Sequence, residues 1–181
     1  GCYIHDTGKQ SPGYGEGVYV GSDVSSWNQY SPAVFNSTII NCTVGPNISA
    51  ECVDIKEGTT GTVIDSCTFY GVGMGDFSTM PPRIANSADS FIDIKCPDIT
   101  GNRKGIDGNS GVSNDVQITR CTFNRFYNPI TGQEGNSNST CCAEGVQLHY
   151  KALTDAQRAM LNAANYNNAV AEIADNIFDM S

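Results

Sequence analysis

The sequence is poor in charged residues, in histidine and in long apolar runs. Charged residues make up 16% of the 181 residues, too few for a disordered charged tail, so we expect the chain to pack. No stretch approaches the roughly 20 consecutive apolar residues that cross a bilayer, so no membrane span is expected. Two histidines and the lack of any Cys-x-x-Cys pair argue against a zinc site.

Positive charge is also scarce. The chain has 19 acidic and 10 basic residues and a formal net charge of -9, so it should repel phosphate, and nucleic acid is not an expected partner. The 19 glycines, together with many Asn, Asp, Ser and Thr residues, favour short strands joined by tight turns. Gly1 leads directly into strand-like residues, so we expect a mature form or a part of a longer chain.

Cysteine, in contrast, is abundant and even in number. Together with four Asn-x-Ser/Thr sequons it predicts a secreted, extracellular protein with N-linked glycans and disulfide bonds. The sequons begin at Asn36, Asn41, Asn47 and Asn138. The disulfide candidates are Cys2, Cys42, Cys52, Cys67, Cys96, Cys121, Cys141 and Cys142. Their connectivity is open, and a column of buried free thiols is the alternative to rung-to-rung disulfides.

Two short phrases recur along the chain. The first is Ile-x-x-Cys-Thr followed by Val or Phe, and its copies begin at Ile39, Ile64 and Ile118. The second alternates apolar and polar residues after an acid or a small residue, and its copies begin at Glu16, Glu51, Ser90 and Glu144. A short strand cannot bury its apolar face alone, but strands stacked about 4.8 Å apart build a continuous column. The repeats therefore predict a solenoid of parallel strands.

Alternation in the second phrase predicts which side chains face the core. The inward residues are aliphatic: Val18, Val20, Val53, Ile55, Ile92, Ile94, Val146 and Leu148. Two rows of opposite parity should face outward, namely Tyr19, Asp54, Asp93 and Gln147, and then Gly21, Lys56, Lys95 and His149.

The last 30 residues change character. Thr154-x-x-Gln157 is a capping box in sequence, and apolar residues then recur at spacings of three and four, which predicts an amphipathic helix. These residues are Ala159, Ala163, Tyr166, Val170, Ile173 and Ile177. We expect residues 1–150 to form the solenoid with loop excursions, and residues 151–181 to form a helical tail that docks on it and caps its open end.

Three stretches resemble the right-handed parallel β-helix proteins of the pectate-lyase-like superfamily: Glu16–Ser22, Asp54–Gly58 and Ser90–Lys95. The resemblance covers roughly residues 1–150 and implies an all-β, right-handed parallel β-helix, here with a C-terminal α-helical cap. It also implies a secreted protein that binds or cleaves polysaccharide. Many members are lyases that use Ca²⁺ and a Lys or Arg base, and others are non-enzymatic adhesins and surface proteins.

The outward rows hold the candidate chemistry. In register, Asp54 and Asp93 are one rung apart and are the candidate Ca²⁺ ligands, and Lys56 and Lys95 are the candidate bases of a lyase. The alternative is an ordinary exposed ion ladder of little energetic value. Because carboxylates raise the pKa of a neighbouring lysine, the ion ladder is the preferred interpretation unless Ca²⁺ neutralises the acids.

Three functions follow as hypotheses. The preferred one is a secreted, glycosylated, non-enzymatic protein with a structural or binding role at an extracellular surface, matrix or filament, which self-associates through its β-helix ends and contacts polysaccharide or glycan. The second is a Ca²⁺-dependent lyase of acidic polysaccharide. The third is a glycoside hydrolase of the same fold, which needs a pair of carboxylates across a cleft.

Overall fold

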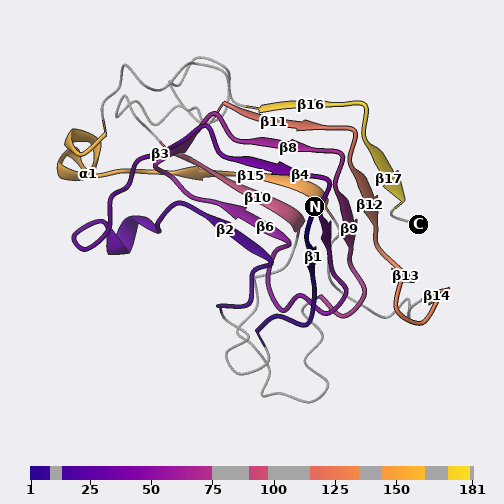
Figure 1. The fold of residues 1–181 in the computed structure, drawn as a ribbon. Coiled ribbons are helices and arrows are strands. Elements are labelled where there is room, and N and C mark those ends of the chain that lie inside the picture. The colour runs from indigo at the N-terminus through magenta and orange to yellow at the C-terminus, as the bar shows by residue number, and fades with distance from the viewer. Residues whose placement is uncertain (9–13, 75–89, 98–114, 135–143, 162–170, 180–181) are drawn as a thin grey trace.

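The computed structural model describes residues 1–8, 14–74, 90–97, 115–134, 144–161 and 171–179, and these form a parallel β-helix (Figure 1). Three parallel sheets run along it. Sheet 1 consists of β2 (Val18–Val20), β6 (Val53–Ile55), β10 (Ser90–Pro97) and β15 (Glu144–Lys151). Sheet 2 consists of β4 (Thr38–Ile40), β8 (Val63–Asp65), β11 (Val116–Thr119) and β16 (Ala171–Ala174). Sheet 3 consists of β1 (Tyr3–Ile4), β5 (Thr43–Val44), β9 (Thr68–Tyr70), β12 (Thr122–Asn124) and β17 (Ile177–Asp179).

Smaller elements decorate the coils. A short parallel pair joins β3 (Val34–Phe35) to β7 (Thr59–Thr60), and β13 (Tyr127–Asn128) with β14 (Gln133–Glu134) forms an antiparallel hairpin. A 3-10 helix, η2, covers Val24–Ser26, and a short α-helix, α1, covers Asp155–Ala159. No helix in the described ranges is long and apolar enough to cross a membrane.

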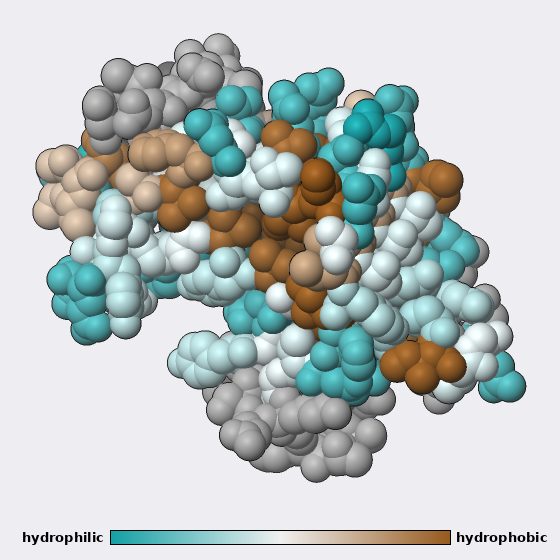
Figure 2. Space-filling view, viewed as in Figure 1, coloured by the Kyte–Doolittle hydropathy of each residue, from teal (hydrophilic) through white to brown (hydrophobic). Residues whose placement is uncertain are grey.

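The strand register confirms the parity expected for the second phrase. Val53 pairs with Val18 on one side and with Ile92 on the other, and Ile92 pairs with Val146. Val53 and Ile92 are completely buried in the main core. The column of aliphatic side chains that the repeats predicted is therefore the core of the solenoid. In the space-filling view, hydrophobic residues gather in the middle of one face and hydrophilic residues frame them (Figure 2).

The first phrase forms the corner between sheets 2 and 3. In each copy the residue before the cysteine has a positive φ, which turns the chain from one sheet to the next, and the next strand follows at once. These corner residues are Asn41, Ser66 and Arg120, with φ of 52°, 53° and 52°. Because the register repeats at every coil, the cysteines behind them stack in one column.

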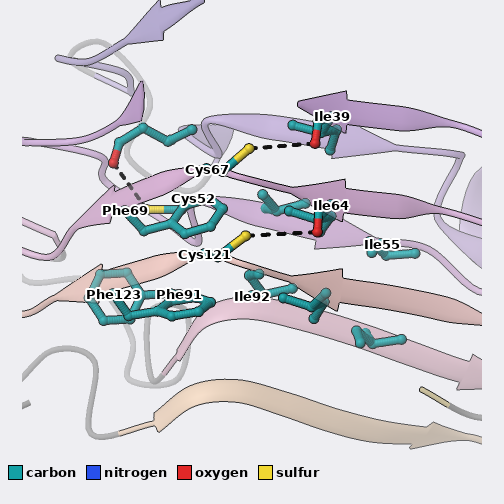
Figure 3. Close-up of a cluster of buried hydrophobic side chains, with 14 of the residues drawn as sticks. Ile39, Cys52, Ile55, Ile64, Cys67, Phe69, Phe91, Ile92, Cys121 and Phe123 are labelled. Carbon is teal, nitrogen blue, oxygen red and sulfur yellow. Dashed lines mark hydrogen bonds between the residues drawn. The ribbon is translucent and has the colours of Figure 1, made fainter. Parts of the chain in front are cut away.

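The stacked cysteines are thiols that hydrogen-bond the coil below. The sulfur of Cys67 contacts the carbonyl oxygen of Ile39 at 3.5 Å, and that of Cys121 contacts the oxygen of Ile64 at 3.8 Å (Figure 3). All six cysteines in the described ranges are free, so the disulfides predicted for them are absent from this structure. The column of thiols, the alternative to disulfides, is the arrangement found here; Cys141 and Cys142 lie outside the described residues.

Sheet 3 adds a stack of aromatic rings. Phe69 and Phe123 are completely buried, with ring centroids 5.0 Å apart, and Phe178 stacks on Phe123 at 4.6 Å. Phe91 meets Phe123 edge-on at 5.6 Å and ties the stack to sheet 1. These rings fill the corner opposite the thiol column.

The helical interpretation of the tail is correct only at its start. The capping box at Thr154 and Gln157 is present and begins α1, but α1 ends at Ala159. Ile173 and Ile177 lie in β16 and β17 rather than on a helix. They pair in parallel with Ile118 and Thr122 of the preceding coil, so this part of the tail is a further coil.

The reason is a fourth copy of the first phrase, Ile173-Ala-Asp-Asn176-Ile-Phe178, in which asparagine replaces cysteine. Asp175 has the corner φ of 57°, and the Asn176 side chain accepts from the Cys121 amide and donates to the Ile118 carbonyl, both at 2.8 Å. Parallel backbone pairing with the preceding coil outweighs the local helical spacing. Ala163, Tyr166 and Val170 lie outside the described residues.

The helix α1 also does not cap the main core. Leu153 and Leu161, on either side of it, pack with Trp27 in a separate small cluster that Val24 of η2 joins. The coil of β16 and β17 instead leaves Ile177 63% exposed and Phe178 45% exposed.

We predict that Asn176→Ala destabilises the protein by about 1–2 kcal/mol, because it removes two hydrogen bonds to the backbone of the preceding coil. Asn176→Cys should lower the free energy of unfolding by less, because cysteine occupies the same corner in three other coils. Urea unfolding measures both, with the exposed Glu172→Ala as the control. Equal losses for the alanine and cysteine variants would contradict the proposed equivalence of the two residues.

Candidate functional site

The two outward rows of sheet 1 form the candidate site, which we call the outer face of sheet 1. Asp93 pairs in register with Asp54 and with Gln147, and Lys95 pairs with His149. The sequence-based alignment of these residues is therefore correct. The sequence also led us to expect these side chains to be exposed to solvent, and most of them are not.

The carboxylates of this face are buried. Asp54 is 3% exposed, Asp93 is 2% exposed and Lys56 is 6% exposed, so these residues do not form the solvated ion ladder that was preferred from the sequence. One carboxylate oxygen of each aspartate, Oδ1, has no hydrogen-bond partner. A buried carboxylate is costly unless it is paired, and each of these aspartates has a lysine beside it. Burial nevertheless raises the pKa of Asp54, and the neighbouring Lys56 opposes that rise.

Lys56 is locked in a charged pair. Its Nζ lies 2.7 Å from Oδ2 of Asp54 and 3.6 Å from Oδ2 of Asp23, and 4.7 Å above the ring of Tyr19. Burial alone would lower the pKa of Lys56, but the attraction of Asp54 outweighs it and the pKa is raised. Lys56 is therefore a poor base and a good permanent cation.

Lys95, Asp93 and His149 form a second group at the edge of the sheet. Oδ2 of Asp93 accepts a hydrogen bond from Lys95 and lies 2.9 Å from Nδ1 of His149. Nζ of Lys95 is 3.1 Å from the same Nδ1. The carboxylate is buried, whereas the side chain of His149 is 46% exposed, so this group reaches from the interior to solvent.

An acidic cluster lies beside Lys56. Carboxylate oxygens of Glu16, Glu51 and Asp54 are all within 4.8 Å of one another. The sequence indicated Asp54 and Asp93 as the candidate Ca²⁺ ligands. In the structure each is paired with a lysine, and Asp54 also clusters with the two glutamates, whereas Asp93 contacts His149. The signal that was missed is the acid that opens the second phrase in three of its four copies.

The donor set of this cluster fits a hard cation. Three carboxylates supply oxygen ligands of the kind that Ca²⁺ prefers, and Asp54 has a buried oxygen without a partner. Burial, followed by repulsion from Asp54 and Asp93, raises the pKa of Glu51 from 4.5 to about 7. A cation at this cluster would relieve that repulsion.

Glu57 is a further buried acid next to the outer face. It is completely buried, burial raises its pKa, and Nζ of Lys151 approaches it to 3.7 Å. Lys151 follows His149 by two residues on β15. Lys56, Lys95 and Lys151 are the three lysines in the described ranges, and all three lie in or directly after strands of sheet 1.

Three predicted glycosylation sites lie in the first full coil. Asn36, Asn41 and Asn47 are exposed and have positive φ, so each occupies a turn. The side-chain amide of Asn47 donates to Oδ1 of Asp6 at 3.1 Å. Asn138 lies outside the described residues.

Comparison with known proteins yields one structural similarity. No protein-family model and no curated protein sequence matches the chain. The chain is similar to the crystal structure of an alginate lyase from Paenibacillus sp. str. FPU-7, with a TM-score of 0.56 and 26% sequence identity. The alignment covers 99% of this chain and 52% of the lyase, so this chain spans about half the length of its structural neighbour. The parallel sheets and this similarity place the chain among the parallel β-helix proteins.

We predict that Glu51→Gln removes part of the pH dependence of stability. Glu51 ionises at about 7 in the folded state and at 4.5 when unfolded, so between these values the folded state binds more protons. The contribution of Glu51 to the free energy of unfolding is therefore fully present below pH 4.5. It is lost as pH rises through about 7, which lowers the free energy of unfolding by up to about 3 kcal/mol. The neutral variant should lack this loss.

Urea unfolding of both proteins from pH 4 to 8 checks this, with Glu172→Gln as the exposed-acid control. If the cluster binds Ca²⁺, added CaCl₂ at pH 8 should raise the unfolding midpoint of the native protein and leave the Glu51→Gln midpoint unchanged. Identical pH slopes for the native protein and the variant would contradict the assigned burial of Glu51.

Proposed function

We propose that this chain is part of a polysaccharide lyase that cleaves an acidic polysaccharide by β-elimination on the outer face of sheet 1. The observation that carries the proposal is the group of Lys95 and His149 on Asp93, because it holds a lysine and a partly exposed imidazole side by side on a sheet. The similarity to an alginate lyase over 99% of the chain supports this second hypothesis over the structural role.

Charge placement also favours this face for a polyanion. The chain carries a net charge of -9, so most of its surface repels an acidic polymer. Lys56, Lys95 and Lys151 gather on sheet 1, and His149 lies among them. Lys56 is buried in its pair with Asp54, whereas the side chains of Lys151 and His149 are 40% and 46% exposed, so β15 at the edge of sheet 1 is where a uronate carboxylate would meet positive charge.

β-Elimination at a uronate needs three actions. A base removes the proton from C5, which is α to the carboxylate, and negative charge develops on that carboxylate. The bond from C4 to the bridging O4 breaks, a double bond forms between C4 and C5, and O4 leaves with a proton. A fixed cation near the carboxylate stabilises the developing charge, and Lys95 supplies one.

A divalent cation fits the same scheme. Glu16, Glu51 and Asp54 would hold it, and it would neutralise the acids beside Lys56 and bind the substrate carboxylate. The residues of the chain itself still orient the polymer and move the proton.

A glycoside hydrolase is the second candidate, and one observation favours it. Glu51 and Glu16 lie close together, and the raised pKa of Glu51, about 7, is typical of a general acid. Hydrolysis releases reducing sugar without an unsaturated product, so the product separates the two reactions.

We predict that the protein forms unsaturated uronate products from alginate or polygalacturonate, detected by ultraviolet absorbance. Lys95→Ala should lower kcat/KM by about 10²-fold or more, because the enolate-like charge loses its fixed cation. Arg120→Ala removes an ion-paired surface cation at the corner between sheets 2 and 3 and serves as the control. The assay is repeated with a chelator to test for a divalent cation. No unsaturated product from any uronate polymer would refute the lyase proposal.

Secretion and glycosylation remain part of the proposal. The combination of exposed sequons at Asn36, Asn41 and Asn47 supports them. Treatment of protein from a eukaryotic secretory host with an N-glycosidase should lower its mass, and an unchanged mass would refute glycosylation.

End-to-end association is a further part of the structural hypothesis, and the exposed apolar residues favour it. Ile177 and Phe178 on one end, and Tyr3 on the other, are 63%, 45% and 51% exposed. A second copy stacked on β17 would bury them and satisfy the strand edge. Sedimentation velocity should then show a species that grows with concentration and that Ile177→Asp suppresses. A concentration-independent monomer would contradict association.

A further inference from the structure

The proposed lyase reaction leaves the proton acceptor unassigned, and the structure offers a specific residue for it. We propose that His149 is the catalytic base and that Asp93 is its positioning residue. The inference rests on the proposed function, and it concerns a histidine that was indicated from the sequence only as an outward residue.

Two contacts bear on the tautomer of His149. Nδ1 lies 2.9 Å from Oδ2 of Asp93 and 3.1 Å from Nζ of Lys95, and Lys95 makes its closer hydrogen bond to the same Oδ2. Because Lys95 donates to the carboxylate and a carboxylate only accepts, we assign the proton to Nδ1, which then also donates to Asp93. The lone pair then resides on Nε2, at the opposite edge of the ring. Because Nδ1 faces a carboxylate that is 2% exposed while the imidazole is 46% exposed, the edge with Nε2 is the part that a bound sugar meets.

The two lysines of the outward row are unsuitable as bases. Lys56 is paired with Asp54 at 2.7 Å and lies against Tyr19. Lys95 is bonded to Asp93 as a charged pair, and in that form it has no lone pair to accept a proton. Lys95 is instead placed to bind the carboxylate of the uronate whose C5 proton His149 removes.

In the described ranges, the charged side chains nearest His149 come from β10, from β15 itself and from β6. Asp93 and Lys95 face it from β10, and Lys151 follows it by two residues on β15. Asp54 and Lys56 lie one strand further, on or directly after β6. Asp93 is the carboxylate in hydrogen-bond contact with the imidazole and orients its ring.

The proton balance is complete without another reactant. Nε2 of His149 takes the C5 proton, the C5–H electrons form the C4=C5 double bond, and the C4–O4 bond breaks. O4 of the leaving sugar takes up a proton from the imidazolium, either directly or through a water that gives its own proton to O4 and receives one from the imidazolium. The histidine returns to its neutral form by both routes.

The test compares the only two histidines of the chain. His5 also has an aspartate partner, with Nδ1 2.6 Å from Oδ2 of Asp6, but it lies next to β1 and its partner is 29% exposed. His149→Gln should lower kcat on alginate or polygalacturonate by about 10²–10⁴-fold with KM nearly unchanged. His5→Gln should leave both constants unchanged.

A second readout separates catalysis from structure. The acidic limb of the kcat/KM profile should disappear from the residual activity of His149→Gln, and added imidazole should restore part of the activity of His149→Gly. Asp93→Asn should lower kcat and change the shape of the acidic limb of the kcat/KM profile, because it favours the tautomer of His149 that carries its proton on Nε2. Thermal unfolding of each variant checks that it is folded.

The outcomes distinguish this inference from the proposed function. If the native protein makes unsaturated product and His149→Gln keeps its kcat, the assignment of the base is overturned and the lyase proposal stands. If the native protein makes no such product from any uronate polymer, both are overturned.

Discussion

The repeating register of the parallel strands is the constraint on which the rest of the molecule depends. Because side chains alternate with a period of two, a register that repeats from coil to coil places like residues over like. This rule stacks Val53 on Ile92 inside the solenoid, and it also stacks Asp54 on Asp93 outside it. The core and the candidate site are thus two faces of one pairing pattern, and a one-residue slip would destroy both.

Stacking like charges has an electrostatic penalty that the same pattern offsets. Aspartates one rung apart repel each other, yet each has a lysine two residues further along its own strand. Along each strand, a negative outward side chain is therefore followed by a positive one. This pairing offsets the cost of burying the carboxylates, which would be high for an isolated carboxylate. The pKa of Lys56 is raised by its pair with Asp54, and Lys95 donates a hydrogen bond to Asp93, so both lysines are engaged with carboxylates and proton abstraction is left to another group.

The corners show how much of the fold is predictable from sequence. Copies of the first phrase at Ile39, Ile64 and Ile118 mark the corner between sheets 2 and 3, and the second phrase marks sheet 1 with correct parity. The copy at Ile173 was missed because Asn176 replaces cysteine there and because Ile173 and Ile177 also fit a helical spacing. Two periodicities coexist in those residues, and pairing with the preceding coil, a non-local interaction, decides between them.

The site was less predictable, for a related reason. Alternation identified Asp93, Lys95 and His149 as outward residues, but their burial depends on what covers the sheet, which a local pattern does not contain. The clustering of Glu16 and Glu51 with Asp54 likewise depends on the register between β2 and β6. Residues on one strand are related by sequence alone, whereas the chemistry here arises between strands.

The edge position of β15 explains why the chemistry concentrates there. Within sheet 1, β6 and β10 are flanked on both sides, and Asp54 and Asp93 on them are buried and paired with Lys56 and Lys95. On β15, the last strand of the sheet, His149 is bonded to a buried carboxylate on one side and open to solvent on the other. A residue that must be oriented by the protein and still reach a polymer needs this boundary. His149 and Lys151 both occupy it, and of the two His149 has an imidazole, which can accept a proton near neutral pH.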